Sequence, residues 1–98
     1  MSTFVDGAKM VAVGSSRQLG AVVRAARRDR GLSQSALAAA AGVSRAWLAR
    51  FEGGHPAASL EPVFRVLDTL GLGLAVTERT FTAAEADVLD TLAAEDQR

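Results

Sequence analysis

Two arginines, Arg45 and Arg50, stand five positions apart in a segment that also contains two small residues, Ala46 and Ala49. A guanidinium group can donate two parallel hydrogen bonds to O6 and N7 of guanine, and a methyl group can contact the methyl of thymine. If residues 45–52 form a helix, these four side chains fall within about 140° of one another. Such a face fits the major groove of DNA. The plain alternative is a solvated helix face, because most arginines are exposed in any case.

The remaining residues of the same segment indicate how it must be held. Leu48 and Phe51 fall near about 300° and about 240° on the wheel, so they share the side that packs against the rest of the protein. Trp47, near about 200°, lies on the border between the two sides. We consider two roles for Trp47: a partly buried packing residue, or a residue that stacks on a sugar-phosphate edge.

A second short helix is predicted immediately before this one, over residues 34–41. Ser33 has the hydroxyl of an N-cap, and strong helix formers follow it. Gly42 ends the pattern where a left-handed residue is needed, because a residue without Cβ takes positive φ at no steric cost. Ser44 is the next N-cap candidate. Two helices joined by about three residues make the short connection of a helix-turn-helix.

The segment GLSQSALAAAAGVSRAWLARFEGG, residues 31–54, closely resembles the helix-turn-helix of the Cro and phage-repressor class, often called XRE-type. The resemblance implies that Gln34 contacts a phosphate and that the recognition helix faces the bases from Ser44, Arg45, Ala46 and Arg50. It also implies a structural ion pair between Arg27 and Glu52. The full set of candidate DNA-binding residues is Arg17, Ser33, Gln34, Ser44, Arg45, Ala46, Trp47, Arg50, Gly54 and His55.

Composition limits the remaining classes of function. The chain has 98 residues, 49% of them hydrophobic, which suits one domain. It contains no cysteine and one histidine, so we expect no disulfide, no metal site, no cofactor and no enzymatic activity. No apolar run approaches the roughly 20 residues of a membrane span, and the N-terminus has no signal-peptide pattern. We expect a cytoplasmic protein without a membrane partner.

The net charge of zero conceals an asymmetry along the chain. Residues 1–58 carry eight basic and three acidic side chains, a net charge of +5, whereas residues 59–98 carry three basic and eight acidic ones, a net charge of −5. A chain of this kind can present one positive surface to phosphate groups while its other end faces water or a different partner.

The N-terminal third of the chain predicts an arm followed by a helix. Residues 1–14 show no helical period and are predicted to be a flexible arm, in which residues 11–13 could add a short strand. A helix is predicted from Ser15 or Ser16 to Gly31. Its outer face carries Arg17, Arg24, Arg28 and Arg30. Phosphate contact and simple solvation explain these arginines equally well, and Arg17 is our preferred phosphate candidate.

After the recognition helix, residues 53–58 read as a loop. The glycines Gly53 and Gly54 would leave N–H groups free to approach phosphate oxygens, as in the XRE class, and His55 could add a hydrogen bond. His55 is equally well explained as an exposed loop residue without a role.

A fourth helix is predicted from its cap Ser59 to Gly71, with Pro62 tolerated in the first turn. Its expected core stripe is Leu60, Val63, Phe64, Leu67 and Leu70. Residues 72–79 then change to period two, which predicts a strand with Leu72, Leu74 and Val76 on one face. A lone strand leaves unpaired N–H and C=O groups, so we expect it to pair with the same strand of a second chain. A capping box at residues 82–85 predicts a last, acidic helix to residue 98.

This order of elements is similar to that of the HipB-type antitoxins within the XRE class. The resemblance implies an all-α, lambda-repressor-like bundle of four to five helices with a short C-terminal β-strand that pairs across a dimer. The expected domains are the arm 1–14, the DNA-binding domain 15–71, the dimerisation strand 72–80 and the acidic helix 82–98. The implied partners are a palindromic double-stranded DNA operator, a second copy as homodimer, and a HipA-like kinase toxin. The alternatives are an XRE-type regulator without a toxin and a protein-interaction adaptor that does not bind DNA.

Overall fold

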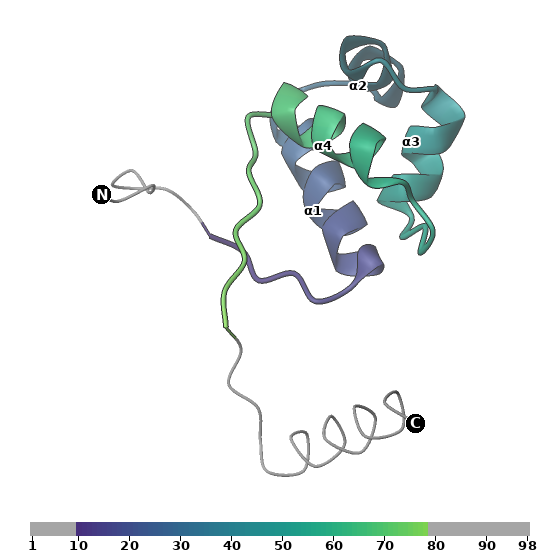
Figure 1. The fold of residues 1–98 in the computed structure, drawn as a ribbon. Coiled ribbons are helices and arrows are strands. Elements are labelled where there is room, and N and C mark those ends of the chain that lie inside the picture. Colours follow the sequence, from purple (N-terminus) through teal and green to yellow (C-terminus); the bar gives the residue numbers. More distant parts are fainter. Residues whose placement is uncertain (1–9, 79–98) are drawn as a thin grey trace.

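The computed structural model describes residues 10–78, which contain four helices (Figure 1). They are α1 (Ser16–Asp29), α2 (Gln34–Ala41), α3 (Arg45–Glu52) and α4 (Leu60–Thr69). The predicted helix-turn-helix pair is confirmed as α2 and α3. The helix predicted at residues 82–98 and most of the predicted arm lie outside the described residues. Within residues 10–78, no helix is long and apolar enough to cross a membrane.

The core forms where three pairs of helices meet: α2 with α4, α1 with α3, and α2 with α3. Its largest fully buried side chains come from all four helices or their ends, and they are Val23, Leu37, Leu48, Phe51, Val66 and Leu70. Burying a side chain of this size contributes about 1.5–3 kcal/mol. The helices therefore hold one another in place through a single apolar core.

Local signals fix the start of α2 and both ends of the turn between α2 and α3. The hydroxyl of Ser33 accepts a hydrogen bond from the N–H of Ala36, and that of Ser44 accepts one from the N–H of Trp47. Gly42 takes the left-handed conformation with φ 72°. Each N-cap satisfies a backbone donor that has no partner within its own helix. Three short-range signals that the sequence displays therefore set the start of α2 and the turn that follows it.

Helix α4 corrects two of the sequence predictions. Ser59 stands at the N-cap position, but its side chain makes no capping hydrogen bond. Leu60 and Phe64, which were predicted to be in the core, are 68% and 48% exposed. Helix α4 packs mainly against α2, and its buried side chains are Val63, Val66 and Leu67. Leu60 and Phe64 lie one turn apart beside that contact.

The chain leaves α4 through Gly71, at φ 70°, and then runs away from the helices (Figure 1). The N–H of Leu72 donates to the carbonyl of Leu67, and the Leu72 side chain packs on the core. Residues 73–78 are exposed, and no strand forms between residues 10 and 78. The described part of the chain supplies no neighbouring strand there to complete a hydrogen-bonded ladder. Pairing of this segment across a dimer stays a prediction.

Candidate nucleic-acid interface

The outer face of α3 is free of core contacts. Arg45, Ala46, Ala49 and Arg50 are all exposed, whereas Leu48 and Phe51 on the opposite side are buried. The side chains therefore divide as the helical wheel predicts. Because alanines lie between the two arginines, the backbone of α3 can approach a flat or grooved partner while both guanidinium groups reach past it.

Trp47 packs at the edge of this face. Its ring is half-buried and stacks on Phe51, with 5.1 Å between ring centroids and 18° between ring planes. An offset stack of this kind adds about 0.5–1.5 kcal/mol to the contribution from buried area. Of the two roles considered for Trp47, the geometry favours that of a packing residue that stiffens α3.

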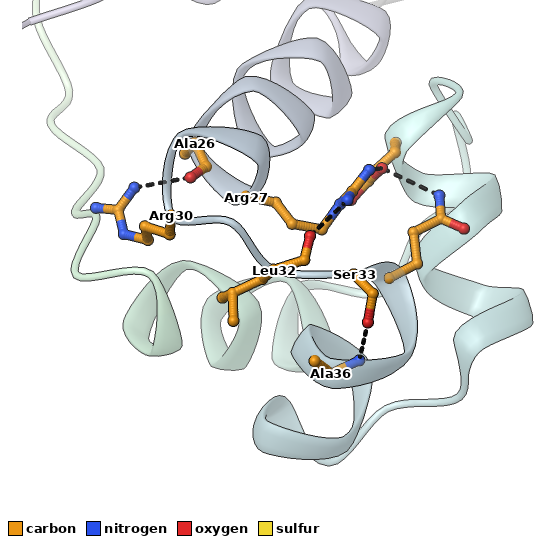
Figure 2. A network of polar contacts seen from close by, with 8 residues as sticks. Ala26, Arg27, Arg30, Leu32, Ser33 and Ala36 are labelled. Atoms are coloured by element: carbon orange, nitrogen blue, oxygen red, sulfur yellow. Dashed lines mark hydrogen bonds and ion pairs between the residues drawn. The ribbon is translucent and has the colours of Figure 1, made fainter.

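A buried ion pair connects the end of α1 to the end of α3 (Figure 2). Nε of Arg27 lies 2.7 Å from Oε2 of Glu52, and Nη2 of Arg27 lies 3.0 Å from Oε1. Nη1 of Arg27 donates to the carbonyl of Leu32 at 2.8 Å, so the guanidinium also holds the turn between α1 and α2. Paired hydrogen bonds between charged groups are among the strongest in proteins.

Burial alone would raise the pKa of the Glu52 carboxyl. The hydrogen bonds from Arg27 and Gln34, together with the positive charges of Arg27 and Arg24, outweigh burial and lower the pKa below its usual value. The hydrogen bond to Glu52 outweighs burial at Arg27 as well, and it raises the pKa of the guanidinium. Both groups are therefore charged at neutral pH, and each neutralises the other inside the fold.

Gln34 belongs to the same network. Its Nε2 donates to Oε1 of Glu52 at 3.1 Å, and the side chain is half-buried. The residue predicted to contact phosphate at the start of α2 thus contacts the carboxylate of α3 in the structure. Through this bond, the first turn of the helix-turn-helix is attached to the same ion pair that fixes the recognition helix.

The loop after α3 differs from the expectation of free backbone donors. The N–H groups of Gly53, Gly54 and His55 donate to carbonyls of Ala49, Phe51 and Arg50, so they complete the C-terminal turn of α3. Gly54 has φ 96°, and a Cβ there would lie 2.9 Å from Cα of Arg17. The expectation that these glycines present N–H groups to phosphate is therefore wrong. Gly54 instead allows the loop to pack on the start of α1, and His55 is half-buried beside it.

Two surface depressions flank the recognition helix on the α1 side. The first, of about 480 Å³, is lined by Arg24, Arg27, Arg28, Ser33, Gln34, Ser35 and Arg45. The second, of about 650 Å³, is lined by Arg17, Ala21, Arg24, Ala25, Arg28, Asp29, Glu52 and Gly53. Arg24 and Arg28 take part in both. The sequence left phosphate contact and solvation equally open for these two arginines, although their spacing of four residues already placed them on one helix face.

Gly20 is a residue that sequence reasoning missed altogether. A Cβ at this position would lie 2.3 Å from the carbonyl oxygen of Phe51 and 2.8 Å from that of Glu52. Helix α1 therefore crosses the end of α3 with its backbone in direct contact. A glycine within a predicted helix lowers helix propensity, and that local cost was the one available sign of a close approach.

A family model described as "Helix-turn-helix domain" matches residues 18–80, well over half of the chain. The chain belongs to this helix-turn-helix family. A curated relative is 39% identical over 56 residues, which are 57% of this chain and 74% of the relative. It is an uncharacterized HTH-type transcriptional regulator, y4mF, of Sinorhizobium fredii (strain NBRC 101917 / NGR234). The protein is accordingly a DNA-binding transcription regulator of the XRE-like helix-turn-helix type.

Two solved structures share the architecture of this helix-turn-helix regulator. They are a "HipB-O4 20mer complex" and a "Structure of HipA-HipB-O2-O3 complex". For each, the TM-score is 0.68 with 25% sequence identity, and the match covers 72% of this chain and all of the other. The HipB-like fold predicted from the sequence is therefore confirmed.

Proposed function

We propose that this protein is a sequence-specific repressor that binds a palindromic operator as a homodimer and acts as the HipB-like antitoxin of a toxin–antitoxin operon. The observation that carries the DNA-reading part is the outer face of α3. It presents Arg45 and Arg50 on a helix whose opposite side is locked into the core. A recognition helix needs both properties, because base edges are read only when the helix is held at a fixed depth and angle in the groove.

In this proposal, Arg45 and Arg50 read guanines, and Ala46 allows close approach and contacts a thymine methyl. The exposed Ser44, at the N-cap of α3, faces the bases at the entrance to the groove. These contacts specify the sequence, whereas contacts to phosphate position the protein. Arg17 and the first turn of α2, at Ser33 and Gln34, provide the positioning contacts.

The homodimer follows from the need for affinity. One recognition helix reads a few base pairs, and a two-fold dimer reads two half-sites about 34 Å or a multiple apart. In the segment predicted to pair, Leu74 is 53% exposed and the side chain of Val76 is fully exposed, whereas Leu72 packs on its own core. The dimer interface therefore rests on Leu74 and Val76 more than on Leu72.

The antitoxin assignment rests on the likeness to HipB, one of whose solved structures also contains HipA. A HipA-like kinase is accordingly the proposed protein partner. The test uses the protein encoded by the neighbouring reading frame. If that protein is a kinase, it should co-purify with this protein at a fixed stoichiometry when the two are co-expressed. A neighbouring frame that encodes no kinase, or a kinase that elutes separately, would leave an XRE-type regulator without a toxin.

The DNA-binding part is tested with a duplex selected by the protein from a random-sequence pool. We expect one inverted-repeat sequence to be enriched, and we expect Arg45→Ala and Arg50→Ala each to weaken binding to it. Arg30→Ala is the matched control. Arg30 is an exposed arginine whose Nη1 donates to the carbonyl of Ala26, and it lines neither depression. A pool that yields no enriched sequence would contradict the proposal.

A further inference from the structure

Helix α1 carries a stripe of arginines along the side that borders the recognition helix. Arg17, Arg24 and Arg28 are spaced by seven and four residues, so they fall within about 40° of one another on the helix. All three are exposed. Because Gly20 brings the backbone of α1 into contact with the end of α3, this stripe lies beside the recognition helix and not on a remote face.

The two depressions join this stripe to the helix-turn-helix. Arg24 and Arg28 line the first depression together with Arg45 of α3 and with Ser33 and Gln34 at the start of α2. The same two arginines continue into the second depression, which reaches Arg17. Arg45, one of the two arginines proposed to read bases, and the α1 stripe therefore border one continuous surface.

The positive charges on this surface outnumber the neighbouring carboxylates. The first depression has no acidic residue in its lining. In the second, Glu52 is committed to Arg27, which leaves Asp29 as the one further acid in the lining. Within residues 10–78, Arg24 and Arg28 form no ion pair. A cluster of exposed cations that outnumber the neighbouring carboxylates suits a polyanion.

We propose that Arg24 and Arg28 bind the phosphodiester backbone of duplex DNA beside the groove that α3 enters, and that they supply affinity without sequence preference. This inference rests on the proposed function and adds two residues and a role to it. Along α1 the two Cα atoms are about 6 Å apart, and phosphates on one strand recur about every 3.4 Å along the duplex axis, so at least two phosphates of one strand fall within the span of these two long side chains. The pair can therefore contact two phosphates of one strand. Base contacts are left to α3, because a helix on the flank of the groove meets backbone and not base edges.

The experiment measures the salt dependence of binding by fluorescence anisotropy, with the selected duplex and with a random duplex of the same length. Each phosphate contact contributes about 0.9 to the slope of log affinity against log salt concentration. Arg24→Ala and Arg28→Ala should each lower the slope by about 0.9 on both duplexes and leave the ratio of the two affinities unchanged. Arg24→Lys, which keeps the charge, should keep the slope. Arg30→Ala, the matched control, should keep it as well.

Both alanine variants keeping the wild-type slope would overturn the inference, as would a loss of slope confined to the selected duplex. Far-UV circular dichroism and urea unfolding check that the variants are folded. A poorly folded alanine variant is replaced by Arg24→Gln or Arg28→Gln, which keep the length of the side chain. If the proposed function is wrong, a different result is expected: the wild type would bind the selected and the random duplex with equal affinity. The salt dependence of binding to the random duplex would still test the two arginines.

Discussion

The substitution Glu52→Gln removes the carboxylate from the buried ion pair with little change of side-chain volume. Arg27 is 7% exposed and Glu52 6% exposed, so the guanidinium that remains is surrounded by protein. The guanidinium keeps its hydrogen bond to the carbonyl of Leu32, but a neutral carbonyl does not neutralise its positive charge. The fold must then either bury an unpaired cation or open the junction between α1 and α3.

Removing one partner of a buried pair costs about 3–5 kcal/mol, because the other charge stays behind. The upper part of this range is expected here, since Glu52 also accepts the hydrogen bond of Gln34 at 3.1 Å. A whole domain is stable by about 5–15 kcal/mol. At about 4–8 °C per kcal/mol for a domain of this size, a loss of about 4 kcal/mol or more should lower the melting temperature by about 16 °C or more.

Urea unfolding at one fixed protein concentration measures the loss, because the stability of a dimer depends on concentration. Far-UV circular dichroism follows the helices. Fluorescence follows Trp47, the only tryptophan of the chain, which stacks on Phe51 at the end of the recognition helix. Coincident transitions by the two probes justify a two-state free energy.

Glu61→Gln is the matched control. It breaks an exposed ion pair in which Nε of Arg65 lies 3.7 Å from Oε1 of Glu61, and the side chains of Arg65 and Glu61 are 48% and 81% exposed. The loss of this pair should change the free energy of unfolding by less than about 0.5 kcal/mol. The double variant Arg27→Met/Glu52→Leu should be more stable than Glu52→Gln, because it leaves no charge unpaired. The reasoning is refuted if Glu52→Gln loses less than about 1 kcal/mol.

The lowered pKa of Glu52 makes its contribution to stability complete above about pH 4.3 and progressively lost as the pH falls through that lowered pKa. In a series of urea titrations, acidification should therefore reduce the stability of wild type more than that of Glu52→Gln. Gly20→Ala places a Cβ 2.3 Å from a backbone oxygen of α3 and should cost about 1–3 kcal/mol in the same assay. Arg45→Ala and Arg50→Ala should each cost about 1–3 kcal/mol of operator affinity and relax preference at one base pair, as measured with single-base variants of the selected duplex. Val76→Pro, which removes a strand hydrogen-bond donor, should sediment as a monomer in analytical ultracentrifugation at a concentration where wild type is dimeric; a dimeric variant would place the interface elsewhere.

The helix-turn-helix was predictable from sequence because its signals are local. Ser33 and Ser44 act as caps within three residues of their partners, and Gly42 marks the turn by itself. The division of α3 into two sides needs only the helical period. Such features depend on residues that are close together in the chain, so they can be predicted without knowing how the helices pack.

The misjudged features depend on which helix lies next to which. Leu60 and Phe64 continue the apolar period of α4, but the period does not reveal that α2 covers only the neighbouring side. Gly20 acquires its role from the crossing of α1 over α3. The N–H groups of Gly53 and Gly54 looked free because a glycine pair resembles an open loop, whereas the end of α3 uses both.

The most direct test of the account is a comparison of two anisotropy titrations at physiological salt, one with the selected inverted-repeat duplex and one with the same duplex after both half-sites are scrambled. We predict that wild type prefers the selected duplex by about 10³-fold or more. The variant Arg45→Ala/Arg50→Ala should lose most of that preference, whereas Arg30→Ala should retain it. Equal affinity of wild type for the two duplexes, or an undiminished preference in the double variant, would contradict the claim that α3 reads the operator.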